Sequence, residues 1–268
     1  MTGVEPTPFS DLVASLAVGT QTLVGELPPD WLQGRTAYGG LSAALCLHAI
    51  DQLVPDLPPL RSAQFCFLGP AVGTLHVAPE ELRRGKSAVF VGANVTAEKG
   101  LAARATFVFG VARPSYLDHT DLPMPAVAGP DDCPAFFGAA GQPAFMDHFD
   151  GRLAAGAKPG TPGAAPGMTV WLRHTDRNAG DSLTSLLAMA DALPPPATIM
   201  FRARDPISTI TWSIDVLDPA PHSETGWWLA ESRAETAREG YSTQVMTIWS
   251  PDGRPVISGR QNVATFEK

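Results

Sequence analysis

The sequence predicts an α+β protein made of two similar halves, each an antiparallel sheet wrapped around one apolar helix. Three observations lead to this prediction. A Pro- and Gly-rich stretch from Pro114 to about Gly167 separates periodic segments, the order of those segments repeats on its two sides, and each side contains one Ala- and Leu-rich segment. A helix that is apolar on most faces has to be enclosed, and a curved sheet can enclose it.

The first half opens with a predicted strand over residues 18–24 and a helix over residues 41–54, directly after Gly39-Gly40. The helical segment contains no Gly or Pro, and Pro55 ends it. Four strands are predicted to follow, over residues 61–68, 75–83, 87–97 and 102–111. Glu98-Lys99-Gly100 joins the last two as a short hairpin turn, because Gly tolerates a positive φ.

The second half repeats this order. Strands are predicted over residues 145–153 and 168–173, and a helix over residues 181–193, with Asp181 or Ser182 as its N-cap. The remaining predicted strands cover residues 208–217, 228–238, 242–249 and 256–266. Pro251-Asp252-Gly253 is the hairpin turn that corresponds to Glu98-Lys99-Gly100.

Matching residues strengthen the repeat. Asp51 lies eleven residues after Gly40, and Asp191 lies eleven residues after Gly180. Two further pairs of short segments match: Leu68-Gly-Pro-Ala with Leu217-Asp-Pro-Ala, and Gly85-Lys-Ser with Gly240-Tyr-Ser. We therefore predict a double hotdog fold, with one hotdog domain over residues 1–113, a linker over 114–134 and a second hotdog domain over 135–268. The two sheets are expected to join into one surface with both helices inside.

Composition narrows the function. The chain has 268 residues, 44% of them hydrophobic, and a net charge of −8, which disfavours non-specific nucleic-acid binding. The chain has three cysteines, Cys46, Cys66 and Cys133, and this odd number with its wide spacing predicts neither a disulfide framework nor a metal site. The six histidines show no metal-ligand spacing. No signal peptide and no apolar run of about 20 residues is recognised. A cytoplasmic protein without metal, cofactor or membrane association is expected, and a homo-oligomer is compatible with the sequence.

Several motifs, in order, resemble those of the acyl-CoA thioesterase II (TesB-like) family. They are Gly34-Arg-Thr-Ala-Tyr-Gly-Gly40 before the first helix, Ser62-Ala-Gln-Phe-Cys-Phe-Leu-Gly-Pro70, Leu82-Arg-Arg-Gly-Lys-Ser87 and Val170-Trp-Leu-Arg173. The resemblance extends from about Val24 to Phe266. It implies a double-hotdog enzyme that hydrolyses acyl-CoA to a free fatty acid and coenzyme A, without a cofactor.

The resemblance also implies a catalytic set: Asp191 near the end of the second helix, Thr209 on the next strand and Gln261 on the last strand. Thr211 is an alternative to Thr209, because the alignment could shift by two residues. After Thr209 the sequence departs from the family, since its usual Asp-His-Ser stretch is replaced by Thr211-Trp-Ser213. In the first half Asp51 is the equivalent aspartate, with only Ser62 and Thr106 near the corresponding strand positions.

These residues suit thioester hydrolysis. Asp191 would deprotonate a water molecule that Thr209 and Gln261 hold in place. Backbone N–H groups near Gly39, Gly40 or Gly180, at the helix starts, would stabilise the oxyanion. The basic cluster Arg83, Arg84 and Lys86 is a candidate for binding the phosphates of coenzyme A, with a solvated turn as the plain alternative.

Other functions are less well supported. Gly180-Asp-Ser-Leu183 matches the GDSL signature of serine hydrolases, but a capping role for Asp181 or Ser182 explains it better. A hydratase is disfavoured because neither Asp51 nor Asp191 has a His five residues later. The alternative from another class is a non-catalytic acyl-CoA-binding or structural double hotdog. Trp212, Trp227 and Phe201 could line a substrate tunnel or fill the core.

Overall fold

A computed structural model describes residues 6–267; residues 1–5 and 268, the outer limits of the two predicted domains, lie outside the described residues. The first half contains α1 (Phe9–Ala14), β1 (Ala17–Val18), β2 (Leu23–Glu26), β3 (Leu32–Gln33), β4 (Thr36–Ala37), α2 (Gly39–Leu53), β5 (Leu60–Phe67), β6 (Thr74–Arg84), β7 (Ala88–Ala97) and β8 (Gly100–Gly110). The second contains β9 (Phe149–Gly156), β10 (Gly167–His174), α3 (Leu183–Ala190), β11 (Ile207–Val216), β12 (Trp228–Arg238), β13 (Tyr241–Trp249) and β14 (Pro255–Thr265). Short 3-10 helices lie at η1 (Pro29–Trp31), η2 (Pro130–Asp132), η3 (Ala144–His148) and η4 (Pro196–Met200).

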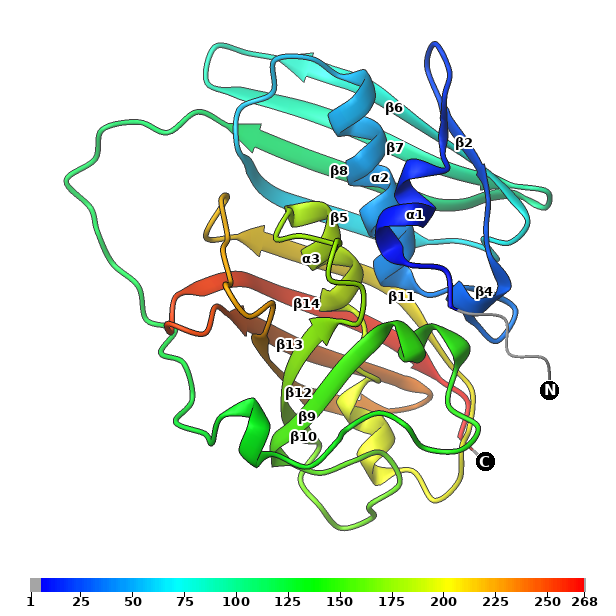
Figure 1. The fold of residues 1–268 in the computed structure, drawn as a ribbon, viewed down its shortest axis with the longest axis vertical. Helices are drawn as coiled ribbons and strands as arrows, with labels where there is room; N and C mark the ends of the chain where they lie inside the picture. The colour runs from blue at the N-terminus through cyan, green and yellow to red at the C-terminus, as the bar shows by residue number, and fades with distance from the viewer. Residues whose placement is uncertain (1–5, 268) are drawn as a thin grey trace.

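One antiparallel sheet of 12 strands runs through both halves, in the order β1-β2-β6-β7-β8-β5-β11-β14-β13-β12-β10-β9. Read from the two ends, the orders β1-β2-β6-β7-β8-β5 and β9-β10-β12-β13-β14-β11 correspond strand by strand. The halves meet at β5 and β11, which pair from Ser62 with Asp215 to Cys66 with Thr211. Helices α2 and α3 lie side by side against the inner face (Figure 1). The predicted double hotdog with a joined sheet is confirmed.

Most predicted elements, including the first helix, lie within two residues of the observed bounds. Residues 18–24 were predicted wrongly as one strand: a tight turn, closed by Gly19 N–H donating to the Thr22 carbonyl at 2.8 Å, divides them into β1 and β2. The strand predicted over residues 145–153 is also wrong at its start, because Pro143 leads into the 3-10 helix η3 and β9 begins only at Phe149. The second helix is shorter than predicted, because Ser182 caps it and Asp191 leaves helical geometry.

The segment between β8 and β9 covers part of the outer face of the second half. Trp249 Nε1 donates to the Leu122 carbonyl and Trp171 Nε1 donates to the Ala128 carbonyl, both at 2.9 Å. Beneath it lies a small apolar cluster separate from the main core: Cys133, Trp171, Trp227, Leu229 and Trp249. The last strand of the first half ends at Gly110 and the first strand of the second half begins at Phe149, so the boundary between the halves lies between these two residues. The linker limits at residues 114 and 134 remain a prediction.

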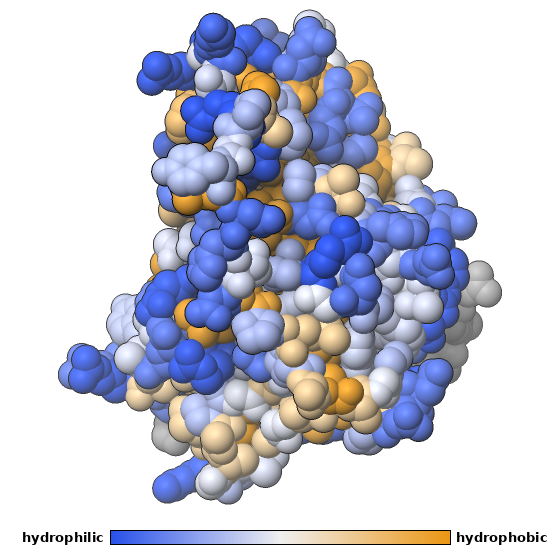
Figure 2. All heavy atoms as spheres, turned by 90° about the vertical axis from the view of Figure 1, so that its left-hand side faces the viewer, coloured by the Kyte–Doolittle hydropathy of each residue, from blue (hydrophilic) through white to orange (hydrophobic). Residues whose placement is uncertain are grey.

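Figure 2 shows the side of the molecule over which this segment runs. Hydrophilic side chains cover most of it, and hydrophobic ones are visible in a recess between the upper and lower parts. Tyr116 and Leu117 of the segment are exposed, at 96% and 72%. The N-terminal part of the linker therefore makes little apolar contact, whereas its C-terminal part, up to Cys133, is packed.

Candidate active site

Asp191 is the residue that directly follows α3, and its side chain faces the beginning of α2 in the other half. The backbone N–H of Gly40 donates to Asp191 Oδ2 at 2.8 Å, and Gln261 Nε2 donates to Asp191 Oδ1 at 2.5 Å. Both carboxylate oxygens thus accept a hydrogen bond from a fixed donor. The site is built from both halves of the chain, since Gly40 belongs to one and Asp191 and Gln261 to the other.

The two glycines at the start of α2 permit this contact. A Cβ on Gly39 would lie 2.6 Å from Asp191 Oδ2, and a Cβ on Gly40 would lie 2.6 Å from the carbonyl oxygen of Ala188. Neither position therefore has space for a larger residue. Tyr38, the residue before them, is buried and donates its hydroxyl hydrogen to the same Ala188 carbonyl at 2.9 Å, which fixes the two helix ends together.

The electrostatics of Asp191 combine opposing effects. A carboxylate at the end of α3 is unfavourable with the dipole of its own helix, but it lies against the N-terminus of α2, where the dipole and free N–H groups favour negative charge. Burial raises the pKa of Asp191 to about 6, although the hydrogen bonds from Gln261 and Gly40 act in the opposite direction. A carboxyl that titrates near neutrality suits a general base.

Thr209 reaches the inner face because β11 contains a β-bulge. The pairing of β11 with β14 shifts between Thr209 and Thr211, so that Thr209 lies opposite the buried Val263 and Thr211 lies opposite Asn262. Because a bulge adds one residue, it reverses the alternation of faces. Thr209 therefore lines the cavity next to Asp191, while Thr211 is exposed on the outer face.

Gln261 on β14 lies opposite Gln244 on β13, and both side chains are buried. Gln244 Nε2 donates to Gln261 Oε1 at 2.6 Å. Gln244 is a residue of this site that the sequence alone does not reveal. Its signal was an amide at an inner-face position of a strand whose other inner positions include Met246 and Ile248, but a lone Gln in a strand does not show which residue it faces.

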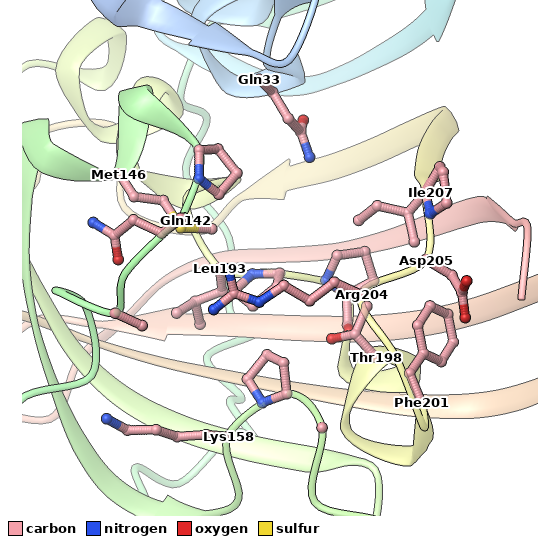
Figure 3. Close-up of a pocket in the computed structure, with 18 of the residues that line it drawn as sticks. Gln33, Gln142, Met146, Lys158, Leu193, Thr198, Phe201, Arg204, Asp205 and Ile207 are labelled. Atoms are coloured by element: carbon pink, nitrogen blue, oxygen red, sulfur yellow. The ribbon is translucent and has the colours of Figure 1, made fainter.

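A cavity of about 650 Å³ opens beside Asp191 and Thr209. Apolar side chains form much of its lining: Phe136, Phe137, Phe145, Met146, Leu193 and Ile207. Gln33 and Gly34, from the β3–β4 hairpin of the first half, complete it, and in Figure 3 Gln33 extends toward it from the top of the view. Such a lining accommodates an apolar chain and leaves the polar groups at Asp191 to fix orientation.

Cationic side chains also line this cavity. They are Lys158, Arg202 and Arg204, and all three are exposed to solvent. Arg204 donates to the Ala140 carbonyl at 2.9 Å and so bridges to the loop on the other side (Figure 3).

The basic cluster predicted from sequence lies elsewhere. Arg83, Arg84 and Lys86 are at the β6–β7 turn, and none of them lines the cavity. Arg84 instead forms an ion pair with Glu81 at 2.6 Å. The structure does not bring this cluster to Asp191, because the turn is at the far end of long strands.

Gly180 is likewise separate from Asp191, since α3 lies between them and its length is roughly 12 Å at 1.5 Å per residue. Gly180 lines a different hollow of about 380 Å³, with His174 and Ser185. The Gly40 N–H, which was expected to face the oxyanion, is occupied by Asp191. Of the three predicted glycines, Gly39 and Gly40 lie at the site and Gly180 does not.

The GDSL segment has a structural explanation. Ser182 Oγ accepts the N–H of Ser185 at 3.2 Å, which is the N-cap bond of α3. Asp181, not Ser182, contacts His222, at 2.7 Å from Nδ1. The seryl oxygen therefore lacks the histidine that would activate it.

Asp51 occupies the equivalent helix end in the first half but has a different environment. It is accessible to solvent, and its side-chain partner is the hydroxyl of Thr184, 3.4 Å away. Partial burial raises the pKa of Asp51 to about 6 as well, so the two aspartates differ in their hydrogen-bond partners and not in pKa. Ser62 and Thr106 pair with outer-face positions, Asp215 and Gln64 respectively, so neither is directed to the inner face on which Asp191 has its partners. The half containing Asp51 has no comparable arrangement.

The three aromatic residues considered as tunnel or core side chains have different positions. Phe201 lines the cavity. Trp212 is on the inner face of β11 and is buried in the main core, and Trp227 belongs to the outer-face cluster. Only Phe201 is placed to contact a molecule in the cavity.

Two family models match this chain. The model described as the acyl-CoA thioesterase N-terminal domain matches residues 27–110, and that described as the acyl-CoA thioesterase C-terminal domain matches residues 130–265. The chain belongs to the acyl-CoA thioesterase family. It is a thioester hydrolase by membership of this family, whose substrates are acyl-CoA thioesters.

Solved structures agree in fold. A hot dog fold protein of unknown function from Alicyclobacillus acidocaldarius has a TM-score of 0.85 and 23% identity, and covers 96% of this chain and 98% of its own. TesB of Mycobacterium avium subs paratuberculosis (TM-score 0.78, 17% identity) and the acyl-CoA thioesterase II TesB2 of Mycobacterium marinum (TM-score 0.74, 19% identity) have the same coverage, 96% and 98%. A search of curated protein sequences found no match.

Two further findings concern this thioesterase-family chain. In residues 6–267 no helix is long and apolar enough to cross a membrane. The same residues hold no group of three or more His, Cys, Asp and Glu side chains arranged to bind a metal ion.

Proposed function

We propose that this chain hydrolyses acyl-CoA to a free fatty acid and coenzyme A, with Asp191 as the general base that activates water. The observation that carries the proposal is the Asp191 carboxylate, held between Gly40 and Gln261 at the wall of a largely apolar cavity. With its pKa raised to about 6, Asp191 is a carboxylate at neutral pH and can still accept a proton.

Thr209 and Gln261 are proposed to hold the water. Gln261 Nε2 carries two hydrogens, of which one is directed to Asp191 and the other is free for the water oxygen. The Thr209 hydroxyl lines the same cavity and can accept or donate. With the water fixed, the thioester carbonyl carbon needs only to lie within about 3–3.5 Å of it.

The reaction is then a direct displacement. The water oxygen bonds to the carbonyl carbon while its proton passes to Asp191, which gives a tetrahedral oxyanion. The C–S bond breaks, the thiolate takes the proton from Asp191, and the acid and free coenzyme A leave. Because Gly40 N–H is bound to Asp191, Gly39 at the start of α2 is the remaining glycine whose backbone N–H could stabilise the oxyanion.

The cavity suggests how the substrate lies. The apolar wall that contains Phe145 and Leu193 suits the acyl chain. Lys158, Arg202 and Arg204 suit the phosphates of coenzyme A, since Arg and Lys form charge-assisted bonds with phosphate. These cations replace Arg83, Arg84 and Lys86 in the proposal.

The test is release of free thiol from short, medium and long acyl-CoAs by the wild type and Asp191→Asn. We expect a decrease in kcat of about 10²- to 10⁴-fold in a variant that remains folded by circular dichroism. Turnover unchanged in Asp191→Asn would exclude Asp191 as the base. No turnover by wild type on any chain length would favour the acyl-CoA-binding alternative.

The phosphate contacts are tested separately. Replacing Lys158 and Arg202 together by Gln should raise KM for acyl-CoA about three- to tenfold with kcat little changed, and the increase should shrink at high salt. The matched control is the pair Arg83→Gln and Lys86→Gln, which removes the same charge from a turn outside the cavity. An equal effect of the two pairs would contradict the assignment.

A further inference from the structure

We propose that Gln244 is a positioning residue of the thioesterase site, which acts on the reaction by fixing the orientation of the Gln261 amide. Gln244 lies in β13 and is 4% exposed, and Gln261 lies opposite it in β14 and is 3% exposed. This inference rests on the proposed function, because it assumes that Gln261 acts on Asp191.

The chain of hydrogen bonds has only one consistent direction. A carboxylate has no hydrogen to donate, so Gln261 has to present its NH₂ group to Asp191 Oδ1, as it does at 2.5 Å. Its carbonyl oxygen Oε1 then faces Gln244, which has to present NH₂ in turn, as it does at 2.6 Å. Without Gln244, the Gln261 amide could rotate and direct its oxygen at the carboxylate.

The fold does not explain a glutamine at this position. Within residues 6–267, Gln244 Oε1 is buried and has no hydrogen-bond partner, which is unfavourable. The first half provides an internal comparison, because Val91 pairs with Phe107 as Gln244 pairs with Gln261. Val91 and Phe107 are both fully buried. An apolar residue therefore satisfies the same position in the same fold.

Gln244 also limits where Gln261 can act. Because its Oε1 is engaged by Gln244, Gln261 is left with one donor for Asp191 and one for a water molecule. Donors directed at the carboxylate favour its charged form, so an amide that rotated would raise the pKa of Asp191 further. The expected signature is a change in the pH dependence of the reaction, which a purely structural residue would not produce.

The experiment compares Gln244→Met, of similar length, and Gln244→Val, which copies Val91, with Ser242→Ala. Ser242 is a matched control, since it is buried on the same strand and face, and its Oγ has no partner in the described part of the chain. The measurement is kcat/KM for one acyl-CoA substrate against pH, with thermal unfolding of each variant. We expect both Gln244 variants to lose about tenfold in kcat/KM and to move the acidic limb up by roughly half a pH unit to one unit. Ser242→Ala should leave the limb in place.

A double variant decides whether Gln244 acts through Gln261. In a Gln261→Met background, Gln244→Met should cause no further loss, because the group that it orients is gone. An acidic limb that does not move, or a loss that persists in the Gln261→Met background, overturns the inference. Asp191→Asn is measured alongside: its retained turnover would overturn the proposed function itself, whereas its inactivity with an unmoved limb in Gln244→Met would overturn only the role of Gln244.

Discussion

The two halves of the chain have the same strand order and an aspartate near the C-terminal end of the central helix, yet only Asp191 lines the cavity. The pairing register of β5 with β8 shifts directly after Leu60, and that of β11 with β14 shifts directly after Thr209. Leu60 is therefore the residue of the first half that corresponds to Thr209. By the same registers, Phe107 corresponds to Gln261 and Val91 to Gln244. All three residues of the first half are buried and apolar.

This difference teaches that the polar residues are additions to a fold that does not need them. The curved sheet and central helix form in both halves with either set of residues. What the second half adds is a row of groups that can hydrogen bond to its aspartate. Substitutions that remove this difference between the halves, or copy it from one half to the other, measure how much it contributes.

The largest effect is expected from the aspartates themselves. Asp191→Asn should lower kcat by about 10²- to 10⁴-fold, whereas Asp51→Asn should change it less than twofold, because Asp51 is exposed and outside the cavity. Thiol release from acyl-CoA measures both. Similar losses in the two variants would show that the halves are functionally equivalent, against the asymmetry described above.

The next effect concerns stability. Val91→Gln copies the second half into the first and should lower the free energy of unfolding by about 2 to 4 kcal/mol, because its amide would be buried opposite Phe107 without a partner. Gln244→Val, the reverse exchange, should cost only about 1 to 2 kcal/mol, because it leaves Gln261 Oε1 without its donor but removes the unpaired Gln244 Oε1. Urea denaturation gives both values. The comparison fails if Gln244→Val is the more destabilising of the two.

The β-bulge in β11 gives a smaller prediction. Thr209→Val keeps the shape of the side chain and removes the hydroxyl that lines the cavity, so kcat/KM should fall about tenfold, equivalent to ~1.4 kcal/mol. Thr211→Val alters the same strand on its outer face and should leave kcat/KM unchanged. Steady-state kinetics measure kcat/KM of both variants. A larger loss in Thr211→Val than in Thr209→Val would show that Thr211 supplies the hydroxyl.

The pH dependence of stability tests the burial of Asp191. Burial raises the pKa of Asp191 from 3.8 to about 6, so the folded state binds a proton more tightly than the unfolded state. The corresponding contribution to stability is complete below pH 4 and is lost as the pH rises through 6. The free energy of unfolding of wild type relative to Asp191→Asn should therefore fall by about 2 to 3 kcal/mol between pH 4 and 7, since each pKa unit corresponds to ~1.4 kcal/mol. A flat difference would show that Asp191 is not desolvated.

The double hotdog fold could be predicted from the sequence, because apolar periodicity, the positions of Pro and Gly and the internal repeat can all be recognised without knowing which strands pair. Asp191, Thr209 and Gln261 came from a family resemblance, and the structure brings Asp191 together with the other two. Two features were out of reach. The bulge after Thr209 depends on pairing with β14, and the partnership of Gln244 with Gln261 depends on register between strands. Arg83, Arg84 and Lys86 lie outside the cavity, because charge clustering in sequence does not show which end of a strand faces it.

The segment held to the outer face by Trp171 and Trp249 makes one polypeptide of two domains that already share a continuous sheet. In an assembly of two identical subunits every residue occurs twice, so a substitution that improves one catalytic pocket is forced on the other. A single chain is free of that constraint. One half can keep the buried Gln244 and Gln261, while the other has Val91 and Phe107 at the corresponding positions. Covalent connection thus permits a division of labour between similar domains: under the proposed mechanism, one supplies Asp191 and its partners and the other supplies Gly40.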